Sequence, residues 1–276
     1  MSLARPRAVF LDLEGTLRWG DMLILGAAEA VRSLRGMGLT LRFLTNIDSK
    51  RPERIASGLG RAGLDVEPGE VFTPMVALQR FLEADPSRRC YFLLSEELRG
   101  CFAEYAVAEP PEAVPRTAAA PGVAADYVVV GDFRDSLSFE RLNRAYRHLL
   151  GGARLMALQR QAYFMGPDGP YLDTGAFVHM LEYVAGVQAA VLGKPDPDFF
   201  RIALRDVGLA AGEVVMVGDD LTTDIAGAAA VGMRTVLVRT GKFSAERLAA
   251  SEVLPDHVVE SAAALPALVE SLITED

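Results

Sequence analysis

Polar side chains suited to holding a cation and a phosphoryl group follow several short apolar runs of this sequence. Carboxylates gathered in one place raise each other's pKa unless a cation lies among them. Ligand sets of oxygen atoms, without histidine or cysteine, suit a hard cation such as Mg²⁺. A lysine beside a hydroxyl and an amide is complementary to a phosphoryl group, toward which the first carboxylate could act as a nucleophile. In chain order these residues are Asp12 and Glu14, with Gly15 directly after them, then Thr45 and Asn46, then Lys194, and then Asp219, Asp220 and Asp224.

Strands and helices that alternate along the chain would position these residues. Hydrophobic periodicity and short joins between elements indicate a parallel α/β sheet. In such sheets ligands bind outside the carboxyl ends of the strands, which is where the polar groups fall. The predicted strands span residues 8–13, 40–45, 214–217 and 235–238, and the predicted helices span residues 27–37, 52–62 and 222–231.

The middle of the chain has a pattern of its own. Residues 106–125 are rich in Ala, Pro, Glu and Val and read as a long connection. Strands are predicted at 127–130 and 155–158 around a helix at 139–149. We therefore expect residues 1–73 and 181–276 to form the core, with residues 74–180 inserted as a smaller α/β domain.

The composition excludes several classes of protein. The chain has 276 residues and a net charge of −9, which disfavours nucleic acid and an anionic membrane surface as partners. Its two cysteines are too few for a disulfide framework. Neither a signal peptide nor an apolar stretch of roughly 18 residues is found in the sequence. We therefore expect a cytoplasmic protein that does not span a membrane.

The stretches "DLEGT", "LTN", "GKP" and "GDDLTTD", in this order, resemble the four motifs of the haloacid dehalogenase (HAD) superfamily of phosphohydrolases. An insertion between the second and third motifs is similar to subclass IIA, which includes NagD-like and p-nitrophenylphosphatase-like enzymes. Longer stretches such as "LNRAYRHLLGGARLMAL" and "GAFVHMLEYVAG" resemble its HDHD-like and phospholysine phosphohistidine inorganic pyrophosphate phosphatase-like branch. The resemblance implies a Rossmann-like core with a cap domain, Mg²⁺ as cofactor and a small phosphorylated substrate.

The resemblance also implies roles for the residues of the first three motifs. Asp12 would be the nucleophile and a Mg²⁺ ligand. Thr45 and Asn46 would donate hydrogen bonds to the phosphoryl oxygens, although a polar strand end can simply cap the next element. Lys194 would balance the negative charge on Asp12 and the phosphoryl group.

The fourth motif would complete the metal site. Asp219 would ligate the Mg²⁺ directly. Asp220 and Asp224 would lie around it, holding waters or Lys194. An acidic residue in the first turn of a helix, as Asp224 is predicted to be, also stabilises the helix dipole.

Glu14 departs from the usual pattern, because most relatives have a second aspartate at this position. That residue acts as the general acid and then as the base, and its backbone carbonyl ligates the Mg²⁺. Glutamate occurs in enolase-phosphatase-like members with a similar "D-x-E-G-T" stretch. Its extra methylene moves the carboxyl group by about 1.5 Å, and catalysis is sensitive to such displacements. The alternative is a carboxylate that only accepts hydrogen bonds from nearby backbone.

The predicted function is Mg²⁺-dependent hydrolysis of a small phosphorylated metabolite through a phospho-aspartate at Asp12. Two alternatives stay open: a phosphatase acting on phosphoramidate or pyrophosphate bonds, and a catalytically weak protein that binds a phosphorylated ligand. Asp132 and Arg134 could contact the substrate, although such charges are more often structural. The resemblance further implies a homodimer, the assembly often expected of relatives with this cap.

Overall fold

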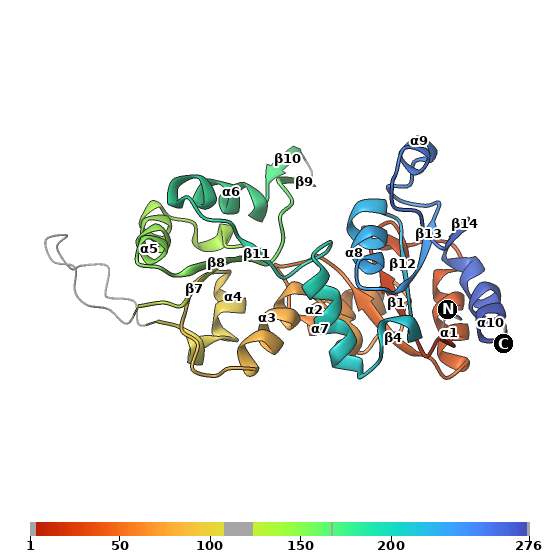
Figure 1. Ribbon diagram of the computed structural model, residues 1–276. Helices are drawn as coiled ribbons and strands as arrows, with labels where there is room; N and C mark the ends of the chain where they lie inside the picture. Colours follow the sequence, from red (N-terminus) through yellow and green to blue (C-terminus); the bar gives the residue numbers. More distant parts are fainter. Residues whose placement is uncertain (1–3, 108–123, 167, 275–276) are drawn as a thin grey trace, which may run out of the picture. The chain divides into compact units, whose positions relative to one another are not determined.

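The computed structural model describes residues 4–107, 124–166 and 168–274, and these fold into two compact units. The core unit comprises Met1–Asn46, Arg51–Thr73 and Lys194–Asp276. The inserted unit comprises Ile47–Lys50 and Pro74–Gly193. Each unit has its own parallel sheet (Figure 1), so the predicted α/β architecture is confirmed.

The core unit is built on a six-stranded sheet with the order β14-β13-β12-β1-β4-β5, in which every neighbouring pair is parallel. All residues of β1, β12 and β13 are buried, as expected for parallel strands covered on both faces. The strands are β1 (Ala8–Asp12), β4 (Thr40–Leu44), β5 (Val71–Phe72), β12 (Val214–Gly218), β13 (Arg234–Val238) and β14 (His257–Val259).

Helices of the core unit begin where the sequence supplies the expected signals. In α1, Ala27, Val31 and Leu34 recur at helical spacing and are buried. Asp196 caps α7 by accepting a hydrogen bond from the Asp198 N–H, with Pro197 at the first helical position. The helices are α1 (Ala27–Gly36), α2 (Pro52–Arg61), α7 (Pro197–Val207), α8 (Ala226–Ala229), α9 (Ala245–Ala249) and α10 (Leu265–Thr274).

Short elements complete the core unit. A hairpin of β2 (Arg18–Trp19) and β3 (Met22–Leu23) follows β1. The helix predicted at 222–231 is instead a π-helical turn, η5 (Leu221–Ile225), that continues into α8. Such π turns are frequent at functional sites. The 3₁₀ turns are η1 (Pro68–Glu70), η4 (Ala211–Glu213) and η6 (Ala262–Ala264).

The inserted unit has a four-stranded parallel sheet with the order β11-β8-β7-β6 and a separate antiparallel hairpin of β9 and β10. Its strands are β6 (Cys90–Leu93), β7 (Tyr127–Val130), β8 (Arg154–Ala157), β9 (Tyr163–Gly166), β10 (Gly169–Leu172) and β11 (Ala190–Val191). Its helices are α3 (Pro74–Glu83), α4 (Glu96–Gly100), α5 (Phe139–Leu150) and α6 (Thr174–Ala185), with 3₁₀ turns η2 (Ala103–Tyr105) and η3 (Arg134–Ser136).

The end of the inserted unit differs from the boundary predicted at residue 180, which would fall inside α6. This helix contacts β7 and β8, and Val178 and Leu181 are buried in the unit's hydrophobic core. The next strand, β11, pairs with β8, so the chain stays in the inserted unit as far as Gly193. Most of the connection predicted at 106–125 lies outside the described residues.

Among the helices in the described part of the chain, none is both long and apolar enough to cross a membrane.

Candidate active site

Neighbouring strands bring the first and fourth sequence motifs together. Asp12 ends β1, and Asp219 directly follows β12, its parallel neighbour in the sheet. Asp224 lies on η5, the turn that follows. Because parallel strands end at the same edge of a sheet, residues more than 200 positions apart converge there.

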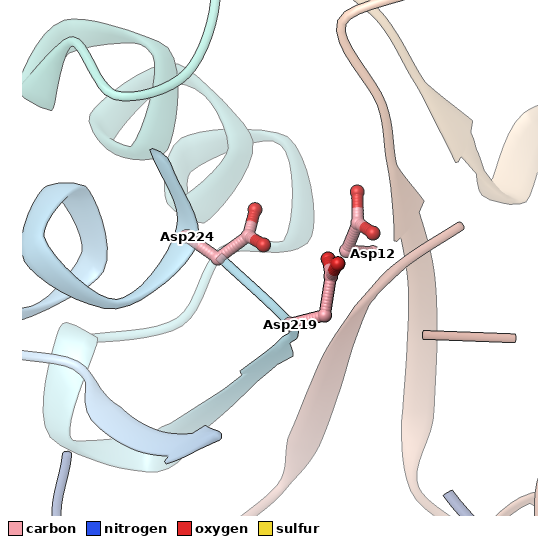
Figure 2. A group of neighbouring side chains, drawn as sticks. All are labelled: Asp12, Asp219 and Asp224. Carbon is pink, nitrogen blue, oxygen red and sulfur yellow. The ribbon is translucent and has the colours of Figure 1, made fainter. Parts of the chain in front are cut away.

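The carboxylates of Asp12, Asp219 and Asp224 form a buried cluster at this edge. Each residue offers an oxygen atom, and these atoms all lie within 4.8 Å of one another. Figure 2 shows the three side chains pointing toward a common region. The arrangement supplies the oxygen-only donor set expected for a hard cation.

Lys194 joins two of these carboxylates. Its Nζ donates to Asp12 Oδ1 at 2.5 Å and to Asp224 Oδ1 at 2.6 Å, and it also lies 3.3 Å from the Leu44 carbonyl oxygen. Burial lowers the pKa of Lys194, but the charges of Asp12 and Asp224 outweigh it and raise that pKa above its usual value. The lysine is therefore a buried, permanently charged ammonium group.

One ammonium group does not neutralise three buried carboxylates. Burial raises the pKa of Asp12, although Lys194 opposes this effect. Burial likewise raises the pKa of Asp219 to about 6 and that of Asp224 to about 6, with Asp224 adding to the effect on Asp219 and Asp12 adding to that on Asp224. The cluster carries excess negative charge, which a bound cation would stabilise.

One oxygen of the cluster is buried without a hydrogen-bond partner. Asp12 Oδ1 accepts from Lys194, whereas Asp12 Oδ2 has no partner among the described residues. A buried carboxylate oxygen without a donor is costly. A divalent cation or an electrophilic phosphorus atom would satisfy it, so the residues present fit the metal that the sequence implies.

Asn46 lies beside Lys194 but is used differently from the expected phosphoryl contact. Its Nδ2 donates to the Lys194 carbonyl oxygen at 2.8 Å, and its Oδ1 accepts from the Lys194 N–H at 2.8 Å. The side chain thereby fixes the backbone that carries the lysine. Thr45, next to it, is buried at the carboxyl end of β4, and its N–H donates to the Phe72 carbonyl oxygen.

Asp220 is a helix cap and does not bond Lys194. Its Oδ1 accepts from the Thr222 N–H at 2.9 Å and from Thr222 Oγ1 at 2.6 Å, which caps η5. Burial raises its pKa, but the bonds from Thr222 and the charge of Lys242 prevail and lower it to about 2. Asp220 is therefore ionised at neutral pH.

Glu14 points to the hairpin that follows it. Its Oε1 accepts from the Gly20 N–H at 2.7 Å, and its Oε2 lies 3.4 Å from Arg18 Nε. The side chain is about half exposed, whereas Asp12 is buried. This is the backbone-bonded arrangement that the sequence left open as the alternative to acid/base chemistry.

The loop after β13, which lies outside the four sequence motifs, also reaches this site. Lys242 N–H donates to Asp219 Oδ2 at 2.6 Å, and Thr240 Oγ1 donates to the Gly15 carbonyl oxygen at 2.5 Å. The signal was available, because polar residues also follow the predicted strand at 235–238. That strand pairs with β12, so its carboxyl end lies beside Asp219.

Family models match two segments of the chain. A haloacid dehalogenase-like hydrolase model matches residues 9–108, and a HAD-hydrolase-like model matches residues 191–265. The matched segments contain Asp12 and Lys194 together with the Asp219 motif.

Similar proteins cover almost the whole chain. The phospholysine phosphohistidine inorganic pyrophosphate phosphatase of Rattus norvegicus is 34% identical over 95% of this chain and 93% of its own length. Haloacid dehalogenase-like hydrolase domain-containing protein 2 of Homo sapiens is 35% identical over 87% of this chain and 86% of its own length.

Solved structures agree with these relatives. The 4-nitrophenylphosphatase of Thermotoga maritima has a TM-score of 0.83 at 26% identity, covering 96% of this chain and 98% of its own. NagD from E. coli K-12 has a TM-score of 0.83 at 26% identity, and the match covers 94% of this chain and 98% of the NagD chain. The chain therefore belongs to the haloacid dehalogenase-like hydrolase family and is a phosphatase of its NagD-like branch.

Proposed function

We propose that this protein is a Mg²⁺-dependent phosphohydrolase that cleaves a small phosphorylated metabolite through a phospho-aspartate at Asp12. The observation that carries the proposal concerns Asp12, beside Asp219 and Asp224. One of its oxygens accepts from Lys194, and the other is buried without a partner among the residues that the structure describes. In this proposal the core unit is catalytic and the inserted unit is a cap that selects the leaving group.

The metal would be held by Asp12, Asp219 and the backbone carbonyl of Glu14, with Asp224 close by. When bound, a divalent cation would neutralise the carboxylates and the phosphoryl oxygens, which lets an anionic nucleophile approach an anionic substrate. The oxygen-only donors and the unpartnered oxygen of Asp12 support a hard cation, for which Mg²⁺ is the proposed identity.

Asp12 would attack phosphorus in line, so that an Asp12 O–P bond forms while the bond from phosphorus to the leaving oxygen breaks. Lys194 would hold Asp12 ionised and oriented and would stabilise charge on the phosphoryl oxygens. Thr45 and the remaining N–H of the Asn46 amide would donate to those oxygens. Water would then hydrolyse the acyl phosphate and release inorganic phosphate.

Glu14 would supply the proton to the leaving oxygen and later take one from water. In that role one carboxylate oxygen would keep its bond to the Gly20 N–H, because such a bond would orient the other oxygen. The longer side chain is the feature that distinguishes this site from one with aspartate at the same position.

Two other activities have specific support. The relatives named for phospholysine, phosphohistidine and inorganic pyrophosphate favour hydrolysis of phosphoramidate or pyrophosphate bonds at the same site. The hydrogen bond from the Gly20 N–H to Glu14 and the ion pair of Glu14 with Arg18 favour a protein that binds a phosphorylated ligand with little turnover.

The test is hydrolysis of p-nitrophenyl phosphate, imidodiphosphate and pyrophosphate by the full chain, with Mg²⁺ or with EDTA. We expect Mg²⁺-dependent phosphate release, reduced roughly 10⁴-fold or more in Asp12→Asn because a nucleophile is lost. Full activity in Asp12→Asn, or in EDTA, would refute the proposal.

The variants Glu14→Gln and Glu14→Asp separate a catalytic role of Glu14 from its hydrogen bond with the Gly20 N–H. Loss of a general acid costs about 10²–10⁴-fold in rate, so Glu14→Gln should be slow while retaining a group that accepts from the Gly20 N–H. An inactive wild type together with an active Glu14→Asp variant would instead show that glutamate at this position prevents phosphatase turnover.

A further inference from the structure

The loop Thr240–Lys242 reaches Asp219 from a strand that carries none of the four motifs. It follows β13, which is hydrogen-bonded to β12 in the sheet. Lys242 N–H donates to Asp219 Oδ2 at 2.6 Å, and the Lys242 Nζ lies 3.2 Å from Asp220 Oδ2. One loop residue therefore contacts two of the three aspartates of the fourth motif, Asp219 through its backbone and Asp220 through its side chain.

The same loop also binds the turn after the nucleophile. Thr240 Oγ1 donates to the Gly15 carbonyl oxygen at 2.5 Å. Gly15 directly follows Glu14, whose backbone carbonyl is a proposed metal ligand. The loop thus links the turn after β1 to the carboxylate after β12.

Two glycines enclose the Asp219 carboxylate. Gly15 has φ +85° and Gly241 has φ +64°, conformations that side-chain-bearing residues rarely adopt. A Cβ atom on Gly15 would lie 2.2 Å from Asp219 Oδ2, and one on Gly241 would lie 1.9 Å from it. The absence of side chains at these two positions leaves room for this carboxylate in one orientation.

Other carboxylates of the cluster are held by different means. Asp224 is fixed by Lys194 and by the Asp220 N–H, and Asp12 is fixed by Lys194. Asp219 instead accepts a hydrogen bond from the loop, through the backbone N–H of Lys242, which no side-chain substitution removes.

We propose that the loop Thr240–Lys242 is a positioning element that holds Asp219 in the orientation that ligates the divalent cation. Groups that orient a metal ligand set its affinity, because the bound geometry is then formed before the metal arrives. This inference rests on the proposed function, since it needs a cation at Asp12 and Asp219.

The first test compares two alanine substitutions with equal backbone strain. Gly241 and Gly208 have φ +64° and φ +66°, but a Cβ on Gly208 meets no atom within 4 Å. Both glycines lie in the core unit. Mn²⁺ binding to the full chain without substrate is measured by the electron paramagnetic resonance signal of free Mn²⁺, with Asp219→Asn as the reference for a lost ligand.

We expect the dissociation constant for Mn²⁺ to rise about 10–100-fold in Gly241→Ala, the usual cost of disturbing a group that orients a metal ligand. In Gly208→Ala it should stay within about twofold of the wild-type value. Equal Mn²⁺ affinity in the two variants would overturn the inference. A wild type that binds no Mn²⁺ would instead refute the proposed metal-dependent function.

A second pair of variants decides the question if Gly241→Ala does not fold. Thr240→Val keeps the shape of the side chain but removes the bond to Gly15, whereas Thr240→Ser keeps the hydroxyl. We expect Thr240→Val to weaken Mn²⁺ binding about tenfold and Thr240→Ser to restore it. Equal affinity in both Thr240 variants would contradict the proposed link.

Discussion

The core unit and the inserted unit each gather three aspartates near one basic side chain, but they use these aspartates differently. The first group comprises Asp12, Asp219 and Asp224 with Lys194, and the second comprises Asp48, Asp132 and Asp173 with Arg134. The first has carboxylate oxygens within 4.8 Å of one another, and one of its buried oxygens has no partner in the described part of the chain.

In the inserted unit each of the three carboxylates accepts a hydrogen bond from a nearby residue. Arg134 donates to both oxygens of Asp132, at 2.9 Å and 2.5 Å. Asp173 caps α6 by accepting from the Thr174 N–H, and Asp48 accepts from Thr174 Oγ1 at 2.6 Å. A count of carboxylates therefore does not identify a cation site. What matters is whether folding leaves their lone pairs unsatisfied.

The largest expected difference between the groups comes from removing the basic residue. Lys194→Met leaves Asp12 and Asp224 buried without their cation, which costs about 3–5 kcal/mol of unfolding free energy at neutral pH. Arg134→Met should cost only about 0–1 kcal/mol, because the Arg134 side chain is 44% exposed. Urea denaturation of both variants at pH 7 measures this, and equal losses would contradict the distinction.

The next prediction concerns the pH dependence of stability through Asp48. Burial raises its pKa from 3.8 to about 7, with further increases from Asp173 and Asp132, while the bond from Thr174 lowers it. Because the folded-state pKa is the higher one, the stabilisation from its protonation is complete below about pH 4 and is lost as the pH rises through 7.

Asp48→Asn keeps an acceptor for Thr174 but does not titrate. We expect its stability relative to wild type to increase between pH 4 and 7, by up to about 4 kcal/mol, and then to stay constant. Denaturant titrations at several pH values follow the difference. If the stability of the variant and of the wild type changed with pH in parallel, Asp48 would not titrate in this range. Phosphatase turnover of Asp48→Asn should stay within about twofold of wild type.

The smallest effects should come from the two aspartates that cap helical turns. Asp220 caps η5 and Asp173 caps α6. Each alanine substitution should cost about 1 kcal/mol of stability, the usual value for a lost cap. Only Asp220→Ala should also weaken Mn²⁺ binding, because Asp220 lies beside Asp219 and contacts Lys242. Equal Mn²⁺ affinity in both variants would show that Asp220 does not contribute to metal binding.

Much of the core unit followed from local sequence signals. Buried parallel strands read as continuous apolar runs, so β1 and β12 were predictable, and polar residues at their ends marked the site. Asp196 and Pro197 at the start of α7 are also local signals, a capping side chain and a proline at the first helical position. Contacts between distant segments were not predictable in this way, since they depend on which strands become neighbours.

Which residues reach the carboxyl edge of the sheet could be predicted from the sequence alone, because strand ends and motif order are local properties of the chain. How those residues are used became clear only from the folded chain. It directed Asn46 to the Lys194 backbone and Glu14 to Gly20, and it brought the loop after β13 to Asp219. Hydrogen-bond partners depend on which groups lie close together once the sheet has formed. Spacing along the chain does not encode this proximity.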